Sequence, residues 1–115
     1  SVIIPFRNEE DNILNSINSI KSQTFPISKF EVIYIDDNSD DNSRLIIENS
    51  EIPDNIRILQ SPFGAEERAH KKKALQYAIG KAKGEIIITT DSDCTHNKNW
   101  LSEMIKCFDK NTAFV

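Results

Sequence analysis

Glycine and cysteine are both scarce in this sequence of 115 residues. The 3 glycines, Gly64, Gly80 and Gly84, are too far apart to form the G-x-G-x-x-G loop that dinucleotide-binding domains use. The 2 cysteines, Cys94 and Cys107, are too few for a disulfide framework, and their spacing matches no zinc-binding pattern. We therefore expect neither a dinucleotide-dependent oxidoreductase nor a disulfide-rich or zinc-stabilised domain.

Long apolar segments and an excess of basic residues are also missing. The sequence has no signal-peptide pattern and no apolar run long enough to span a membrane. Its formal net charge of −4 argues against general binding to nucleic acid. Hydrophobic residues make up 38% of the chain and charged residues 28%, which is typical of a globular domain. We expect a cytoplasmic protein with no nucleic-acid partner.

Short apolar segments alternate with amphipathic ones along the whole chain. β-Branched and aromatic residues predict strands at residues 2–5, 30–35, 56–59 and 85–90. Apolar residues at helical spacing predict helices at residues 11–22, 44–49, 69–83 and 100–108. This alternation predicts an α/β fold with a Rossmann-like, mostly parallel sheet and helices on both faces.

The ends of these elements carry further expectations. Asn8, with acidic residues behind it, is a plausible start for the first helix, and Gly84 closes the third. Residues 113–115 look like the start of another strand. We expect residues 1–115 to be part of a single longer domain, cut before its second half.

Two acidic clusters follow predicted strands. Asp91 and Asp93 come directly after one apolar run, and Asp36 and Asp37 follow another. In open α/β sheets, ligands bind at the carboxyl ends of the strands. Two carboxylates this close repel each other unless a cation or protons relieve them, and Mn²⁺ or Mg²⁺ would also attract phosphates. The alternative is that both clusters are ordinary turns.

Other polar residues lie near the same expected edge of the sheet. Arg7 and Glu9, just past Pro5, would either touch a nucleotide or cap the first helix. Three lysines follow His70, against the helix macrodipole, which a bound anion would offset; a solvated basic face is the alternative. We expect His96, just past the second acidic pair, to be a surface residue rather than a ligand.

Five segments together resemble the ordered motifs of the family 2 glycosyltransferases. Residues 1–10 resemble the opening strand and loop, and residues 30–39 the uridine-binding turn. Residues 71–75 are similar to a Lys-x-x-Ala-Leu helix start. Residues 84–94 match a Gly-Glu strand that runs into a DxD metal motif, and residues 99–101 match the Trp-Leu that follows it. The resemblance covers nearly the whole chain.

The resemblance implies a GT-A fold and an inverting transfer of a sugar from a nucleotide-diphospho-sugar donor, in most cases a UDP-sugar. The acceptor would be a saccharide or lipid-linked hydroxyl, and the cofactor Mn²⁺ or Mg²⁺. The general base would come from beyond Val115, so no catalytic base is named here. In the full-length protein, the cytoplasmic face of a membrane becomes a further expected location.

The resemblance also assigns site residues by position. Either Asp36 or Asp37 would read the base, and the sequence leaves that choice open. Asp93 would hold the metal with Asp91, which would also lie near the ribose and sugar. Nucleotide contacts would come from Lys71, near the diphosphate, and from a nucleoside pocket lined by Pro5, Arg7 and Glu9.

Two departures and several alternatives remain. His70 stands where the family often has glycine, and Thr95 and His96 replace a commoner proline-containing turn. Asp91 also fits the nucleophile motif of haloacid-dehalogenase phosphatases, but that motif normally opens its domain. A response-regulator receiver would need the pair Asp36 and Asp37 on its first strand, but the pair lies on the second. A non-catalytic nucleotide-binding module is the main alternative to an enzyme.

Overall fold

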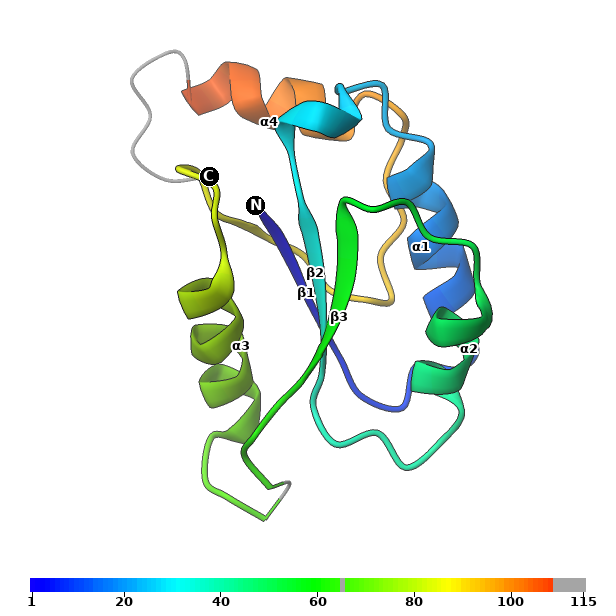
Figure 1. Ribbon diagram of the computed structural model, residues 1–115, viewed down its shortest axis with the longest axis vertical. Coiled ribbons are helices and arrows are strands. Elements are labelled where there is room, and N and C mark those ends of the chain that lie inside the picture. The colour runs from blue at the N-terminus through cyan, green and yellow to red at the C-terminus, as the bar shows by residue number, and fades with distance from the viewer. Residues whose placement is uncertain (65, 109–115) are drawn as a thin grey trace.

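The fold is an open parallel sheet of four strands (Figure 1). The computed structural model describes residues 1–64 and 66–108. Its strands are β1 (Val2–Phe6), β2 (Val32–Asp36), β3 (Ile56–Gln60) and β4 (Ile88–Thr89). They pair in the order β3-β2-β1-β4, and every pairing is parallel. This confirms the predicted α/β class.

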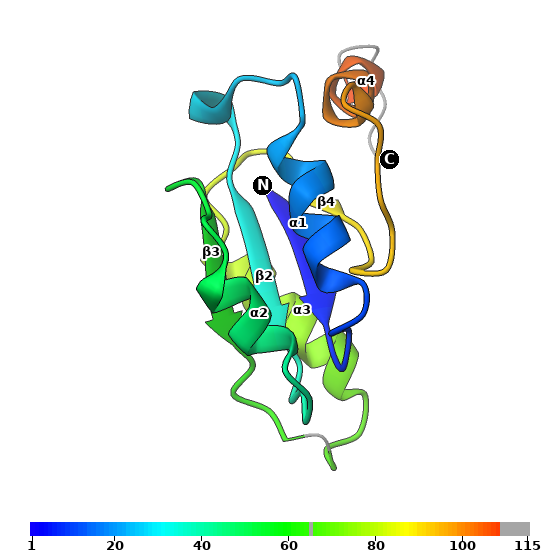
Figure 2. The same cartoon turned by 90° about the vertical axis from the view of Figure 1, so that its right-hand side faces the viewer.

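Helices cover both faces of the sheet. They are α1 (Ile13–Lys21), α2 (Ser43–Asn49), α3 (His70–Lys81) and α4 (Trp100–Phe108), with a short 3-10 helix at Ile27–Lys29. Figures 1 and 2 show α1 and α2 on one face and α3 on the other, with α4 at the end where the strands begin. The predicted helix of residues 100–108 is therefore confirmed.

Successive side chains of β1 pack on opposite faces of the sheet. Ile4 and its neighbours two residues away pack with Ile17 of α1, whereas Ile3 packs with Ala74 of α3. All five residues of β1 are buried, as expected for a central strand covered on both sides. Each fully buried isoleucine contributes about 1.5–3 kcal/mol relative to an exposed one. This burial fixes the strand ends that carry the polar residues.

Strand β4 is shorter than predicted. Only Ile88 and Thr89 pair, with Val2 and Ile3 of β1, whereas the apolar pattern predicted a strand over residues 85–90. The pattern reports burial, and Ile87 is partly buried against α3 without belonging to the strand. Apolar character alone therefore overestimated the paired length of this edge strand.

Two predicted helix ends are wrong. Helix α1 begins at Ile13, and Asn8 lies in a turn with φ 54°. The Asn8 N–H donates to Ser39 Oγ, and its Oδ1 accepts from the Asp40 N–H, so it joins two loops. Helix α3 ends at Lys81, before Gly84, because Ala82 is already extended. The predicted strand start at residues 113–115 lies outside the described residues.

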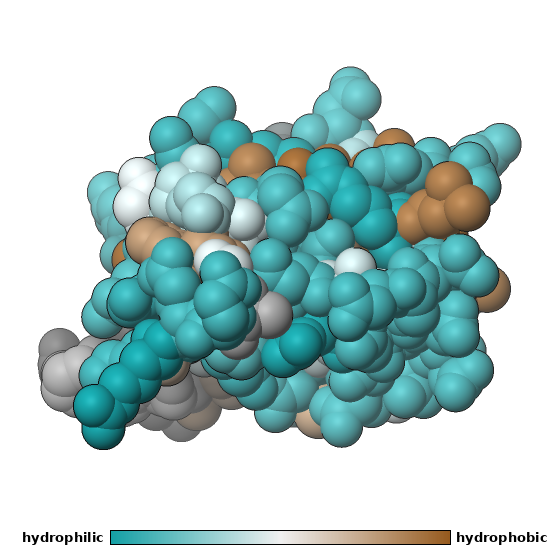
Figure 3. Space-filling view, turned by 90° about the horizontal axis from the view of Figure 1, so that it is seen from below, coloured by the Kyte–Doolittle hydropathy of each residue, from teal (hydrophilic) through white to brown (hydrophobic). Residues whose placement is uncertain are grey.

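Strands β1, β2 and β3 end toward the lower edge of Figure 1, near the start of α3. Figure 3 views this edge from below and shows a mostly hydrophilic surface. Among the described residues, no helix combines the length and apolar character that crossing a membrane requires.

Candidate nucleotide and metal site

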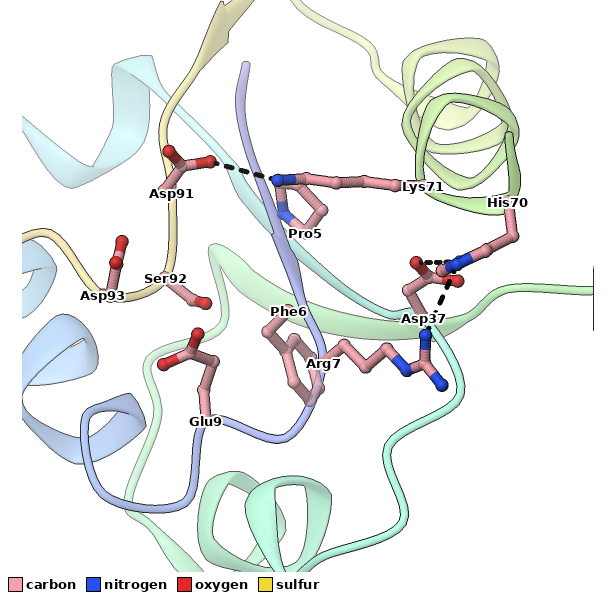
Figure 4. Close-up of a pocket in the computed structure, with 10 residues that line it drawn as sticks. All are labelled: Pro5, Phe6, Arg7, Glu9, Asp37, His70, Lys71, Asp91, Ser92 and Asp93. Atoms are coloured by element: carbon pink, nitrogen blue, oxygen red, sulfur yellow. Dashed lines mark hydrogen bonds and ion pairs between the residues drawn. The ribbon is translucent and has the colours of Figure 1, made fainter. Parts of the chain in front are cut away.

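A pocket of about 220 Å³ opens at this edge of the sheet. Four separate segments supply its walls: the end of β1, the turn after β2, the first turn of α3 and the loop after β4 (Figure 4). The lining residues are Pro5, Phe6, Arg7, Glu9, Asp37, His70, Lys71, Asp91, Ser92 and Asp93. Every site residue predicted from the sequence lines it except Asp36.

The structure separates the two adjacent carboxylates. Asp36 is the last residue of β2, paired with Phe6, and its Oδ1 accepts a hydrogen bond of 2.9 Å from the Ser39 N–H. Asp36 therefore stabilises the turn. Asp37 is the first residue beyond the strand and lines the pocket, although its side chain is only 3% exposed.

His70 links Asp37 to the other side of the pocket. Its Nδ1 lies 2.7 Å from Asp37 Oδ2, and its Nε2 lies 3.3 Å from Arg7 Nη1. The sequence marked His70 only as a departure from the family pattern. Phe6 and Ser92 were not predicted to line the pocket either, although each lies beside a predicted residue.

Lys71 reaches toward the second acidic cluster. Its Nζ lies 3.7 Å from Asp91 Oδ1, and both side chains are well exposed. Figure 4 shows the lysine side chain extended past Pro5 toward Asp91. An exposed ion pair of this kind contributes little to stability. Its position matters more, because it puts a positive charge between the two acidic ends of the pocket.

Asp91 and Asp93 are exposed on either side of Ser92, whose side chain is buried. Ligand atoms of Asp91, Asp93 and Cys94 lie within 4.8 Å of one another. Desolvation and then the carboxylates of Asp93 and Asp91 raise the pKa of the Cys94 thiol. Carboxylate oxygens in this negative environment fit Mn²⁺ or Mg²⁺, which prefer hard oxygen ligands.

Glu9 both caps the start of α1 and lines the pocket. Its carbonyl accepts hydrogen bonds from the Asn12 and Ile13 N–H groups at the start of α1. Its side chain lines the pocket, and one carboxylate oxygen accepts from Asn12 Nδ2 at 3.2 Å. Arg7 lines the opposite wall, where it contacts His70.

Three non-glycine residues within 1–64 and 66–108 have positive φ, and each is next to a pocket residue. Asn8, at 54°, lies between Arg7 and Glu9; Asn38, at 63°, follows Asp37; and Ala69, at 57°, precedes His70. Such conformations are costly for residues with a side chain and cluster at functional sites. The strained turns aim the side chains of their neighbours into the pocket.

His96 does not line the pocket. Its ring stacks on Trp100 at 3.9 Å, and its Nε2 lies 2.8 Å from Thr90 Oγ1. Burial lowers the pKa of His96. His96 is thus partly buried rather than fully at the surface, because the indole covers the imidazole and holds the loop after β4 against α4.

Comparison with known proteins identifies the class of this site. The profile of glycosyl transferase family 2 matches residues 1–115. Glycosyltransferase AglE of Haloferax volcanii is 36% identical over 102 residues, 88% of this chain and 32% of that protein. Poly(ribitol-phosphate) beta-N-acetylglucosaminyltransferase TarS of Staphylococcus aureus is 32% identical over 115 residues, 100% of this chain and 20% of that protein.

Comparison with solved structures also finds glycosyltransferases. TarS 1-349 in complex with UDP-GlcNAc has a TM-score of 0.80 at 31% identity, covering 95% of this chain and 30% of that one. Mannosyltransferase PcManGT of Pyrobaculum calidifontis, in complex with GDP-Man and Mn²⁺, has a TM-score of 0.71 at 30% identity, covering 82% of this chain and 27% of that one.

The chain belongs to glycosyl transferase family 2 and shares the GT-A fold of TarS. This confirms the family resemblance and argues against the phosphatase, receiver and oxidoreductase alternatives. The chain spans about a third or less of the length of these relatives.

Proposed function

We propose that the protein carrying this chain transfers a sugar, with inversion, from a UDP-sugar to an acceptor hydroxyl. One observation carries the proposal: Asp37, from the turn after β2, and Asp91 and Asp93, from the loop after β4, line the same pocket. A nucleotide-diphospho-sugar needs both ends, a polar group for its base and a cation site for its diphosphate. The UDP-GlcNAc bound by TarS supports the choice of uridine.

At the base end, Asp37 is the group we assign to recognition. An ionised carboxylate accepts a hydrogen bond from the N3–H of uracil, whereas cytosine has no proton at that position. Pro5, Arg7 and Glu9 would form the walls of the nucleoside site. Asp36 takes no part in this assignment because its carboxylate is used within the turn.

At the other end, Asp91 and Asp93 would hold Mn²⁺ or Mg²⁺, and Asp91 would also approach the ribose and sugar. A divalent cation bound there would stabilise the negative charge on the departing diphosphate. Lys71 would add a second positive charge beside the phosphates, since its Nζ already lies 3.7 Å from Asp91 Oδ1. The Mn²⁺ in the PcManGT complex supports a metal-dependent donor site.

The transfer itself requires an acceptor and a base. The acceptor hydroxyl would attack the anomeric carbon, a base would take its proton, and the nucleoside diphosphate would leave. We propose a saccharide or lipid-linked acceptor and a base from beyond Val115. The residues named above would serve the leaving-group side of this reaction.

Titration calorimetry of UDP with and without Mn²⁺ tests the proposal. We expect Mn²⁺ to strengthen binding to the wild-type chain and to have no effect on Asp93→Asn. Asp54→Asn is the matched control, because Asp54 is exposed and lies outside the pocket, and it should keep the metal dependence. Equal binding of UDP to the wild type in both conditions would refute the metal assignment.

A further inference from the structure

His70 is a titratable residue of the pocket to which neither the family resemblance nor the proposed donor site gives a role. It opens α3, 33 residues along the chain from Asp37, yet its ring bridges Asp37 and Arg7 (Figure 4). We propose that His70 is a positioning residue that holds the Asp37 carboxylate in the orientation required to discriminate uracil from cytosine. This inference rests on the proposed function.

The hydrogen-bond partners define the tautomer of His70. A guanidinium group has donors only, so Arg7 Nη1, at 3.3 Å, donates to Nε2. Nε2 must then carry the lone pair, which leaves the proton of the neutral ring on Nδ1. The Nδ1–H donates to Asp37 Oδ2 at 2.7 Å. Hydrogen-bond donation thus runs in one direction, from Arg7 to His70 and from His70 to Asp37.

These hydrogen bonds restrict the orientation of the Asp37 carboxylate but leave it able to accept a further hydrogen bond. Oδ2 accepts from His70, and Oδ1 accepts from Asn38 Nδ2 at 3.2 Å. Each carboxylate oxygen can accept two hydrogen bonds, so a base N–H can still be bound. Because both oxygens are held, the carboxylate plane cannot rotate to suit a different base. A fixed acceptor favours uracil, whose N3 carries a proton.

The backbone and burial support this role. Ala69, with φ 57°, turns the chain just before α3. His70, the first residue of α3, therefore lies beside the end of β2. The His70 side chain is 25% exposed and that of Asp37 is 3% exposed, so water competes weakly for their contact. A hydrogen bond to a largely buried charged group is stronger than one at the surface.

The ratio of the dissociation constants of CDP and UDP tests the inference. We expect His70→Ala to reduce this ratio about tenfold, the effect of one hydrogen bond to a charged group. His70→Asn should retain most of it, because an asparagine amide can donate from near the Nδ1 position. His70→Gln places its amide near Nε2 and should behave like alanine. Gln76→Asn, on an exposed position of α3, controls for asparagine in this helix.

A second measurement examines the network without nucleotide. Nitrogen-15 spectra of the imidazole at mildly alkaline pH should show a protonated Nδ1 and an unprotonated Nε2 for His70. An Nε2–H tautomer would overturn the inference, as would an unchanged CDP to UDP ratio in His70→Ala or equal ratios in the asparagine and glutamine variants. If His70→Ala does not fold, the comparison of asparagine with glutamine decides.

The two proposals fail in different ways. A wild-type chain that binds UDP no better than CDP would overturn base recognition by Asp37 and the role of His70 together. A clear UDP preference that is indifferent to His70 would leave the proposed function standing and remove only the positioning role.

Discussion

Asp36 and Asp37 have the same side chain and adjacent positions, yet their surroundings give them different tasks. Asp36 lies within the sheet, where its carbonyl accepts from the Ser61 N–H and its carboxylate holds the Ser39 N–H. Asp37 lies one residue beyond, where its carboxylate meets His70 at the pocket. One step along the chain thus separates a carboxylate that stabilises the turn from one that lines the pocket.

Substitution of each aspartate separates these tasks. Asp37→Ala should weaken UDP binding by about 1.5–3 kcal/mol and abolish the preference over CDP, because a charged hydrogen bond is lost. Asp36→Ala should keep the preference but lower the free energy of unfolding by about 1–3 kcal/mol, because the Ser39 N–H loses its acceptor. Calorimetry and urea denaturation measure the two effects. A UDP preference that follows Asp36 instead would reverse the assignment.

Ala69 shows strain at the scale of one residue. Its φ of 57° and ψ of 38° are left-handed, a conformation that costs an L-residue about 1–2 kcal/mol. Glycine adopts it without that cost, although glycine also gains entropy in the unfolded chain. The strain is local to the turn that carries His70.

We therefore expect Ala69→Gly to raise the free energy of unfolding by about 0.5 kcal/mol in urea denaturation. Ala82→Gly is the matched control, because Ala82 at the other end of α3 has φ −73° and should lose stability instead. A loss of stability in Ala69→Gly would show that the left-handed turn is not strained.

At the scale of elements, a buried polar contact joins α1 to the sheet. The Tyr34 hydroxyl on β2 lies 2.9 Å from Ser16 Oγ on α1, and both side chains are buried. Burial raises the pKa of Tyr34 to about 12, although the contact with Ser16 opposes this shift. The ring also packs edge-on against Phe6 of β1.

This contact predicts a loss of stability in alkali. The folded pKa of Tyr34, about 12, lies above the ordinary value of ~10, so the folded state prefers the protonated phenol. This preference stabilises the folded state by about 2–3 kcal/mol. The stabilisation is fully present below pH ~10 and is lost as the pH rises toward 12. Tyr34→Phe should remove this part of the pH dependence in urea denaturation. Tyr77→Phe, on α3, should retain it; an equal alkaline loss in Tyr34→Phe would exclude Tyr34 as its source.

At the scale of the whole molecule, the parallel sheet brings distant segments to one edge. Asp91, in the loop after β4, lies 54 positions after Asp37, in the turn after β2. Both line the pocket because β1 lies between their strands. These are the walls that we propose for the donor site. The relatives that bind or transfer sugars are about three to five times as long as this chain.

We expect the chain alone to bind UDP without acceptor-dependent sugar transfer. An inverting reaction needs a base beside the acceptor as well as a site for the leaving group, and the proposed function assigns the pocket to the leaving group. Chromatography of products from a UDP-sugar, with and without an acceptor saccharide, measures this, and slow hydrolysis to free sugar is the most that should occur. Efficient transfer by the chain alone would place the base within residues 1–115.

The order of strands and helices and the position of the acidic residues followed from the sequence alone. Apolar periodicity reports burial, so β1, β2 and β3 were predicted within two residues of their ends. In a parallel sheet all carboxyl ends meet at one edge, so the sequence alone predicted that the residues after each strand lie close together. Asp37, Asp91 and Asp93 are found there.

Only the tertiary structure decided which residues of that edge face the pocket. The pairing of Asp36 with Phe6 and Gln60 draws it into the sheet and places Asp37 beyond the strand, where it lines the pocket. Apolar periodicity does not determine at which of two adjacent residues a strand ends. His70 meets Asp37 because α3 packs against β1 and β2, a contact between segments far apart in the chain. Such long-range contacts depend on how whole elements pack, and no local pattern of residues encodes them.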